Sequence, residues 1–407
     1  MDTAVIVILI SEALLCLVLL WKEGLIGSPY RFFIAVCAVG LAFLLRSCVL
    51  DYRTLDYRDF LSRWVEFFRL NGGFAALEKP VGNYNIPYLY FLALFSYSDI
   101  NDLYLIKCLS FLFDVLLAYA SMKLLSRFTE SRGRLLACFL TVLFLPTVFL
   151  NSAVWAQCDS MYVSLALLGI YCAMDDRPVP AMILAALSFG VKLQAVFILP
   201  VYAVLWMQGK LKLRHFLIFP LSYVILVLPA VIAGRPFTDT VLLYLSQTGS
   251  IGGGLSYNSP SLFALFGNIE NTALASKLAV VAAFIYMFLV LAAAWTQRES
   301  LSDESVMWAG FLLALGIPFL LPHMHERYFF ACDIFALLLS FALPRLSAAA
   351  VLGQFASLLG YHAYLKRKYF LPMSYGSAAL ILLMITGFFG YYGSLSGKNF
   401  KFSQKSA

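Results

Sequence analysis

The segment 51-DYRTLDYRDFLSRWVEFFRLNGGFAALEKPVGNYNIPYLY-90 is a long polar interruption between two apolar segments of the chain. It concentrates carboxylates in a sequence of 407 residues that is 62% hydrophobic and only 13% charged. These carboxylates are Asp51, Asp56, Asp59, Glu66 and Glu78. A loop of this length in a compact protein is usually functional or disordered, and its aromatic residues and Gly-Asn-Tyr-Asn turn favour order. We therefore expect it to hold a catalytic base just outside a membrane.

Apolar segments of about 15 to 22 residues recur along the chain, as membrane-spanning helices require. Soluble domains carry roughly 25% charged residues, well above the 13% found here. We therefore expect an all-α polytopic membrane protein, a single domain over residues 1–407 with about thirteen transmembrane helices. The expected spans are residues 4–20, 32–50, 103–122, 135–150, 160–174, 179–191, 195–207, 216–233, 273–295, 305–321, 328–343, 347–363 and 372–392.

Other features of the composition exclude several classes of protein. The eight Cys residues are scattered singly without CxxC spacing, which predicts neither a disulfide framework nor a zinc site. The net charge of +7 is typical of a membrane protein with basic cytoplasmic loops, and no basic run resembles a nucleic-acid-binding surface. The first apolar segment lacks a positively charged start and a small-residue cleavage site, so we expect a retained helix and not a signal peptide.

Clusters of basic residues predict the orientation of the chain, because short cytoplasmic loops are enriched in Lys and Arg. The clusters that define the cytoplasmic side are Lys123, Arg127, Arg132 and Arg134, then Lys210, Lys212 and Arg214, and finally Lys398, Lys401 and Lys405. The outward side then holds the first loop with its juxtamembrane helices (51–102), residues 151–159, 192–194 and 322–327, and a second long loop (234–272). The cluster Lys366, Arg367 and Lys368 falls outside in this scheme. Either the span count near the C-terminus is wrong by one, or these residues meet anionic lipid or a phosphorylated substrate.

Asp56, in LDYRDFLSRW, is the first candidate for chemistry. An outward carboxylate can accept a proton from an attacking hydroxyl group. Asp59 lies three residues further on and would share a helix face with Asp56. The alternative is that Asp simply stabilises a helix N-terminus.

Two further outward motifs contain polar residues that a sugar could contact. In GNYNIPYLY, the turn at Asn83, Tyr84 and Asn85 precedes a helix over residues 87–97 that is too short to span the membrane and would lie on the outer face. The turn is either purely structural or presents its Asn side chains to a sugar. In WAQCDS, Trp155 is typical of an interfacial aromatic belt, whereas Gln157 and Asp159 could equally serve interface structure or substrate contact.

The motif PHMHERYFF gathers His323, His325, Glu326 and Arg327 between two apolar segments. Two His residues at positions i and i+2 do not share a helix face, which disfavours a helical zinc pair. Arg binds phosphate groups bidentately, so the cluster fits a phosphate better than a metal. Positive interfacial anchoring is the alternative, although outward loops are where it is least expected.

Lys107, Asp114 and Asp333 are among the ionisable residues that fall inside expected spans. Such residues usually face a bundle interior or a cavity and are often functional. They predict either an ion pathway or a structural pairing, and the sequence does not identify their partners.

Taken together, GNYNIPYLY, WAQCDS, the Lys192-Leu-Gln194 turn and PHMHERYF resemble motifs of bacterial membrane glycosyltransferases of the GT-C superfamily, in particular the group related to the second GPI mannosyltransferase. The His-Met-His-Glu-Arg run is also similar to the His-x-His-Glu-Lys run of the ER glucosyltransferases that extend the dolichol-linked oligosaccharide. The resemblance covers roughly residues 51–343.

This resemblance implies an inverting transfer of a hexosyl unit from a polyprenyl (undecaprenyl) phosphate donor to an acceptor, on the outer face of a bacterial cell membrane. Asp56 would be the base, with Asp51, which also precedes a Tyr, and Asp59 as rival or supporting carboxylates. His325 and Arg327 would bind the donor phosphate, together with His323 and Lys192. The pocket would include Asn83, Tyr84, Asn85, Gln157, Asp159, Gln194 and Glu326. No cofactor or metal is implied.

Two other functions remain open from the sequence. A sugar transporter or lipid flippase would use Asp114 and Asp333 for coupling ions, although transporter sites generally lie at the membrane midplane. A polysaccharide ligase or polymerase would use a diphosphate-linked glycan. The sequence identifies neither the sugar nor the acceptor.

Overall fold

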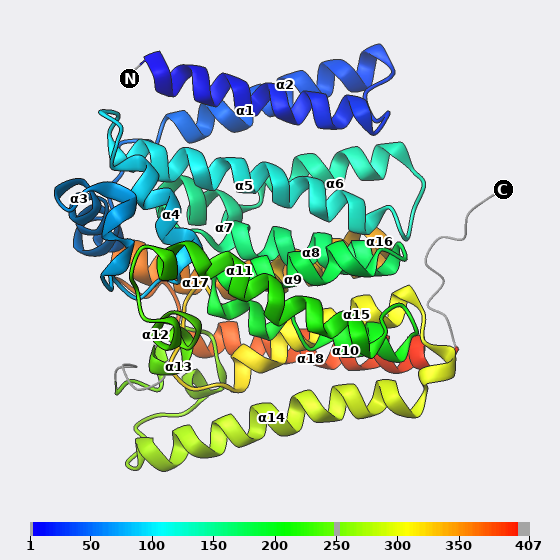
Figure 1. The fold of residues 1–407 in the computed structure, drawn as a ribbon. Helices are drawn as coiled ribbons and strands as arrows, with labels where there is room; N and C mark the ends of the chain where they lie inside the picture. The colour runs from blue at the N-terminus through cyan, green and yellow to red at the C-terminus, as the bar shows by residue number, and fades with distance from the viewer. Residues whose placement is uncertain (1–2, 248–252, 398–407) are drawn as a thin grey trace.

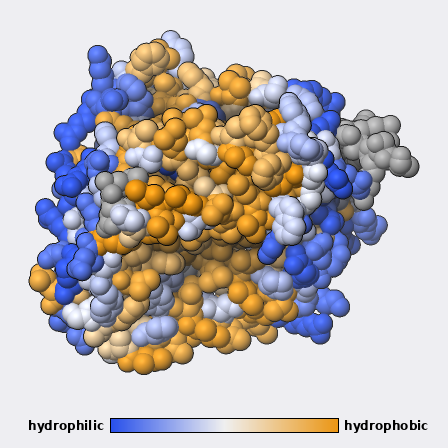
Figure 2. Space-filling view, turned by 90° about the horizontal axis from the view of Figure 1, so that it is seen from above, coloured by the Kyte–Doolittle hydropathy of each residue, from blue (hydrophilic) through white to orange (hydrophobic). Residues whose placement is uncertain are grey.

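The computed structural model describes residues 3–247 and 253–397. The chain is folded almost entirely into helices, and the long helices lie side by side along one direction (Figure 1). Figure 2 shows a broad apolar band between two polar ends. An apolar band of this kind is what contact with the interior of a bilayer requires. The expected all-α polytopic membrane architecture is therefore confirmed.

In the described part of the chain, seven helical segments are long and apolar enough to cross a membrane, and a bent pair makes an eighth. The earlier expectation of about thirteen spans is not confirmed by this criterion. The seven segments are α1 (Thr3–Lys22), α2 (Pro29–Ser47), α5 (Asp102–Leu125), α14 (Thr272–Thr296), α15 (Asp303–Leu320), α18 (Met373–Leu395) and the continuous stretch Leu213–Ile232, which joins a 3-10 turn (Leu213–Leu217) to α11 (Ile218–Ile232).

The bent pair replaces the straight span expected over residues 135–150. Helix α6 (Arg132–Phe144) ends before Pro146, and α7 (Pro146–Phe149) continues into a π-helical turn (Leu150–Val154) after a bend of 43°. Pro lacks a backbone N–H and disfavours helical geometry in the residue before it, which explains the break. After the bend the chain continues directly into the polar WAQCDS motif.

Shorter apolar helices account for most of the other expected spans. They are α8 (Asp159–Met174), α9 (Pro178–Val191), α10 (Val201–Met207) and α16 (Phe330–Ala342), joined by the longer α17 (Ser347–Lys366). The span expected over 195–207 is instead a 3-10 turn (Leu193–Phe197) followed by α10. Pro200, which lies between them, cannot donate a backbone hydrogen bond.

The two long loops carry short elements of their own. The first holds a π-helical turn (Tyr57–Leu61), α3 (Ser62–Leu70), a 3-10 turn (Gly73–Glu78) and α4 (Ile86–Phe95), so the predicted short helix after the Asn turn is confirmed. The second holds α12 (Phe237–Val241), α13 (Leu243–Gln247), β1 (Ser256–Tyr257) and a 3-10 turn (Leu262–Leu265). Two more 3-10 turns, Arg298–Ser300 and Pro344–Leu346, connect helices.

Strand β1 pairs in parallel with β2 (Met324–His325), with Ser256 opposite Met324 and Tyr257 opposite His325. The second long loop is thereby fastened directly to the PHMHERYFF motif. Because successive side chains of a strand point to opposite faces, the two residues of β1 face different surroundings.

Ion pairs show which connections share an end of the bundle. At one end Lys123 pairs with Glu23 (3.0 Å), Arg127 with Asp303 (2.8 Å), and Lys210 with Asp176 (2.9 Å). The other end gathers α3, α4, α12 and α13 (Figure 1). Lys398, Lys401 and Lys405 lie outside the described residues.

The basic cluster Lys366–Lys368, unlike the other basic clusters, was placed on the outward side from the sequence. In the structure it lies at the end of the bundle that holds the two long loops. Tyr364, two residues before Lys366, donates a hydrogen bond to Asp56 in the first long loop. The basic cluster therefore lies at the same end of the bundle as the first long loop, as the order of the expected spans predicts. The position of this cluster does not require a different number of spans near the C-terminus.

The ionisable residues inside the helices have structural partners. Asp114 accepts hydrogen bonds from Arg46 (2.8 Å), Ser152 and Ser160 (2.6 Å each). Lys107 donates to the carbonyl oxygens of residues 49, 50 and 52, where the end of α2 leaves acceptors free. Asp333 accepts a hydrogen bond from Ser357 (3.0 Å). The structural pairing left open by the sequence is thus observed, although the Oδ2 atom of Asp333 forms no hydrogen bond among the described residues.

Candidate active site

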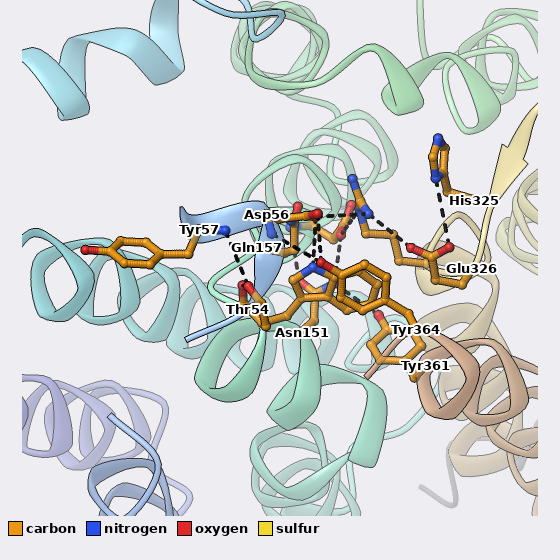
Figure 3. Close-up of polar contacts among 12 residues, drawn as sticks. Thr54, Asp56, Tyr57, Asn151, Gln157, His325, Glu326, Tyr361 and Tyr364 are labelled. Atoms are coloured by element: carbon orange, nitrogen blue, oxygen red, sulfur yellow. Dashed lines mark hydrogen bonds and ion pairs between the residues drawn. The ribbon is translucent and has the colours of Figure 1, made fainter. Parts of the chain in front are cut away.

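Asp56 lies at the centre of a cluster that joins four distant parts of the chain (Figure 3). Its Oδ2 atom accepts hydrogen bonds from Trp155 Nε1 and Gln157 Nε2, both at 2.9 Å. Its Oδ1 atom accepts a hydrogen bond from the Tyr364 hydroxyl at 2.7 Å. An Nη1 atom of Arg327 lies 3.7 Å from Oδ2. The Asp56 side chain keeps 22% of its surface exposed, so it is held in place but not sealed off.

The backbone around Asp56 is fixed by its neighbour Thr54. The Thr54 hydroxyl donates to the Trp155 carbonyl (3.2 Å) and accepts from the Tyr57 amide (3.4 Å). Asp56 directly precedes the π-helical turn Tyr57–Leu61. The loop is thereby tied to the WAQCDS motif by both main-chain and side-chain hydrogen bonds.

Trp155 is buried at this cluster, and the expectation of an interfacial belt residue is wrong for it. Its ring stacks on Tyr364, with centroids 3.8 Å apart and planes 12° apart, and the Arg327 guanidinium lies 5.2 Å from its centroid. The next residue, Ala156, has a φ of 61°, which is uncommon for a residue with a Cβ. This left-handed residue lets Trp155 and Gln157 donate to one carboxylate oxygen.

Asp159 forms the second carboxylate centre, and its side chain is only 1% exposed. Lys192 Nζ lies 2.6 Å from Oδ1, and Asn151 Nδ2 donates to Oδ2 at 2.7 Å. Asn151 also donates to the Tyr361 hydroxyl (3.0 Å). The buried Asp159 therefore has its charge balanced and its acceptors occupied, unlike the partly exposed Asp56.

Arg327 connects the carboxylates of the site. It lies 3.8 Å from Asp159 and 3.4 Å from Glu326, in addition to its contact with Asp56. Within the described part of the chain its Nε atom is buried without a hydrogen-bond acceptor. Burial raises the pKa of Glu326 to about 7, although the charge of Arg327 opposes that shift. Arg327 thus keeps an N–H donor, 3.8 Å from Asp159 Oδ2, that forms no hydrogen bond among the described residues.

A cavity of about 510 Å³ opens next to this cluster. Tyr84 links the two, because it lines the cavity and its hydroxyl donates to Gln157 (3.1 Å). The cavity walls contain most of the residues predicted from the sequence to bind donor or sugar, together with aromatic residues of the long loops. The predicted residues among them are Asn83, Tyr84, Asn85, Lys192, Gln194, His323, His325 and Arg327.

The two His residues of the motif have different surroundings. His323 has a φ of 62°, and its ring contacts the Gly254 carbonyl (2.7 Å) and the Ser276 hydroxyl (3.1 Å), which fastens the motif to the second long loop and to α14. The His325 ring stacks on Tyr257, with centroids 4.8 Å apart, and its side chain is 39% exposed to the cavity. Desolvation in this recess and the charge of Arg327 lower the pKa of His325 to about 4. At neutral pH it is therefore an uncharged hydrogen-bonding group.

Asn85 is largely committed to the fold. Its side-chain oxygen accepts the amide of Ile86, the first residue of α4, at 2.9 Å, and its Nδ2 donates to Tyr223 (3.2 Å). It is fully buried, as a helix-capping Asn can be. For Asn85 the structural interpretation of the turn is therefore observed, while Asn83 lines the cavity.

The two rival carboxylates stand apart from the cluster. Asp51 is exposed and accepts a hydrogen bond from Tyr104 on α5. Asp59 is exposed on the π-helical turn. A π-helix is wider than an α-helix, so residues three apart lie on different faces there, and the expectation that Asp56 and Asp59 share a face is wrong. In the described residues, no group of three or more His, Cys, Asp or Glu side chains could hold a metal ion.

Several residues of the cluster were not anticipated from the sequence: Thr54, Asn151, Tyr361 and Tyr364. Asn151 precedes the WAQCDS motif and is polar at the end of an apolar segment, which is a usable signal. Tyr361 and Tyr364 lie in an apolar helix among many aromatic residues and carry no such signal. Their role follows only from the packing of α17 against the first loop.

A protein-family model matches part of the chain. Residues 94–208 match the model of a family described as alpha-(1->6)-mannopyranosyltransferase, N-terminal domain. The matched residues include Trp155, Gln157, Asp159 and Lys192 but not Asp56 or Arg327. A comparison with curated proteins finds no match. Together with the apolar helices, the family match supports a membrane glycosyltransferase.

Proposed function

We propose that the protein transfers a hexosyl unit from a polyprenyl-phosphate-linked donor to an acceptor on the outer face of a bacterial cell membrane. The observation that carries the proposal is the position of Arg327. It lies 3.7 Å from the Asp56 carboxylate and also lines the cavity of about 510 Å³. The proposed base and the proposed phosphate-binding cation therefore lie next to one another, beside a cavity that would hold the sugar.

In the proposed reaction Asp56 is the base. It takes the proton of the acceptor hydroxyl, whose oxygen attacks the anomeric carbon of the donor sugar. The bond from that carbon to the phosphate oxygen breaks, and polyprenyl phosphate leaves with the bonding electrons. A single displacement of this kind inverts the anomeric configuration. Phosphate is a good leaving group, so a second carboxyl group acting as general acid, as in glycosidases, is not required.

Positive charge next to the cavity would stabilise the departing phosphate. Arg327 supplies a buried Nε–H without a protein acceptor, and Lys192 lines the same cavity beside Asp159. His325 would add a neutral N–H donor. Glu326 would hold Arg327 in position, since its carboxylate lies 3.4 Å from the guanidinium.

Two finer features of the proposal rest on different observations. The family match makes mannose the sugar to test first. The outward location rests on Lys123, Arg127 and Lys210, which lie at the end of the bundle opposite the site and mark the cytoplasmic side. Nucleotide sugars are absent outside the cell membrane, which favours a lipid-linked donor.

The test uses purified protein with a panel of polyprenyl-phosphate sugars, including the mannosyl form, and a membrane extract as the source of acceptor. Release of free polyprenyl phosphate is measured. The proposal predicts release from a monophosphate donor and no release from a diphosphate-linked glycan. Release from the diphosphate donor alone would indicate a ligase or polymerase. Movement of an intact donor across vesicle membranes without bond cleavage would indicate a flippase.

A further inference from the structure

A second cavity, of about 550 Å³, lies at the same end of the bundle as the candidate active site. One wall comes from the second long loop and includes Ser256, Asn258 and Ser259. The other comes from the connection after α17 and includes Tyr369 and Phe370. None of these residues belongs to the Asp56 cluster or to the cavity beside it.

The walls of this cavity are fastened to the body of the protein. The Tyr369 hydroxyl donates to Asn258 Oδ1 (2.6 Å), which joins the two walls. Ser377 of α18 donates to the Ser261 carbonyl (2.9 Å) and so anchors the second long loop to α18. The cavity is therefore a feature of packed elements and not of a free loop.

The segment that directly precedes the lining residue Tyr369 is strongly basic. Lys366, Arg367 and Lys368 directly precede Tyr369, and all three are exposed. Arg367 has a φ of 52° and ends α17, so the chain turns sharply here. Within residues 3–247 and 253–397, no carboxylate forms an ion pair with any of the three. Because these cations lie on the side that we assign to the exterior, the usual cytoplasmic enrichment does not account for them.

A buried hydroxyl group in the wall has no partner. Ser259 is fully buried and lines the cavity, and in the described residues its Oγ atom forms no hydrogen bond. Buried polar groups are nearly always hydrogen-bonded, so the unpartnered Ser259 hydroxyl is a donor that a water molecule or a bound ligand can satisfy. A phosphate oxygen accepts such a hydrogen bond and also attracts the three cations.

The outer part of the rim is aromatic and apolar. Tyr369 is 57% exposed and Phe370 is 73% exposed, next to the basic residues. Aromatic residues beside basic ones are typical of the region where lipid headgroups meet acyl chains. A ligand with both a phosphate and an acyl chain would use both parts of this rim.

We propose that this second cavity binds the phosphate-bearing headgroup of an anionic lipid. The phosphate contacts Ser259 and the cations of residues 366–368, and the acyl chains pass over Phe370. The cavity shares β1 with the candidate active site, since Ser256 lines one cavity and Tyr257, which stacks on His325, lines the other. A bound lipid would thus touch the strand that supports the neighbouring site.

Native mass spectrometry of the full-length protein, released from detergent, tests the proposal. The protein is titrated with phosphatidylglycerol and, in a parallel series, with phosphatidylcholine. Phosphatidylglycerol should bind more tightly, and Lys366→Gln with Lys368→Gln should weaken its binding by roughly tenfold to thirtyfold. Arg367 is left unchanged because of its left-handed backbone. The matched control is Lys212→Gln with Arg214→Gln, which removes the same charge from exposed positions far from the cavity and should leave binding unchanged.

A second variant separates the cavity from the surface charge. Ala264 lines the cavity, and Ala264→Phe fills it while keeping all the cations. This variant should also lose the preference for phosphatidylglycerol. Normal lipid binding by Ala264→Phe, equal binding of the two lipids by the wild type, or equal losses in the two charge variants would overturn the proposal. Displacement of the lipid by inorganic phosphate would overturn it too, because free phosphate would then be the ligand.

Discussion

The Tyr364 hydroxyl donates a 2.7 Å hydrogen bond to Asp56 Oδ1, between residues 308 positions apart in the chain. The same tyrosine ring stacks on Trp155, whose indole N–H donates to the other oxygen of Asp56. Both oxygens of the carboxylate are therefore oriented by groups that also pack against each other. Such an arrangement holds a base in one geometry before substrate arrives.

Tyr364→Phe should lower kcat by about tenfold, the equivalent of about 1.4 kcal/mol for one lost hydrogen bond to a charged group. The phenyl ring keeps the stack on Trp155, so KM for the donor should change little. Steady-state kinetics measure both constants. Tyr391→Phe is the control, because it removes a buried hydroxyl that donates to Val290, away from the site. Equal losses of kcat in the two variants would show that Tyr364 acts only through stability.

Lys192→Met should destabilise the protein by about 3–5 kcal/mol, because it leaves the buried Asp159 carboxylate without its main counter-charge. Adding Asp159→Asn should recover part of this loss. Denaturant unfolding in detergent measures both. Lys123→Met, which breaks a partly exposed pair with Glu23, should cost roughly 1 kcal/mol or less. A small cost for Lys192→Met, similar to that of the control, would show that Asp159 is not held as an ion.

The sequence was sufficient to predict the all-α membrane class and the polar motifs that converge on the site. Asp56, Gln157, Asp159, Lys192 and Arg327 carry polar groups in an apolar chain, and a membrane protein places such groups at its ends or in a cavity. Their catalytic and binding roles stay predictions. The number of spans was harder to predict from the sequence, because Pro146 and Pro200 interrupt apolar segments that look continuous by composition.

Other features depend on packing that no local pattern encodes. In the sequence, Trp155 looks like an interfacial tryptophan. Only the packing of α17, which places Tyr364 on its ring, shows its different role. Arg46 looks like the end of a span, yet it is buried and pairs with Asp114. Ala156 has a left-handed backbone that orients Trp155 and Gln157, and an alanine gives no sign of a positive φ in the sequence.

Glu326→Gln should flatten the pH dependence of both stability and donor binding. Because burial raises the pKa of Glu326 to about 7, the native state keeps a proton that the unfolded state, where the carboxyl group has its ordinary pKa of 4.5, has released. Wild-type stability should therefore fall as the pH rises between these two values. Above pH 7 the Glu326 carboxylate also neutralises Arg327, so KM for the donor should rise. Thermal unfolding and steady-state kinetics across this pH range measure the two effects. The same pH dependence in Glu326→Gln as in the wild type would contradict the raised pKa of Glu326.

Asp114→Asn should reduce stability by about 3–5 kcal/mol, because it leaves Arg46 buried without its counter-charge. Transfer activity per folded molecule should be unchanged, since Asp114 lies in the helix bundle and not in the cluster around Asp56. Unfolding and activity are measured on the same preparation. A stable variant that has lost all transfer activity would contradict a purely structural role for Asp114.

The most direct test of the central claim compares wild-type protein with Asp56→Asn. Asn keeps the shape of the side chain but cannot accept a proton from the acceptor, so polyprenyl phosphate release should fall by about a hundredfold or more. Asp51→Asn and Asp59→Asn serve as matched controls, because both carboxylates are exposed and lie outside the cluster. The account predicts that only Asp56→Asn loses release while donor binding is retained. Equal release by Asp56→Asn and the wild type would contradict it.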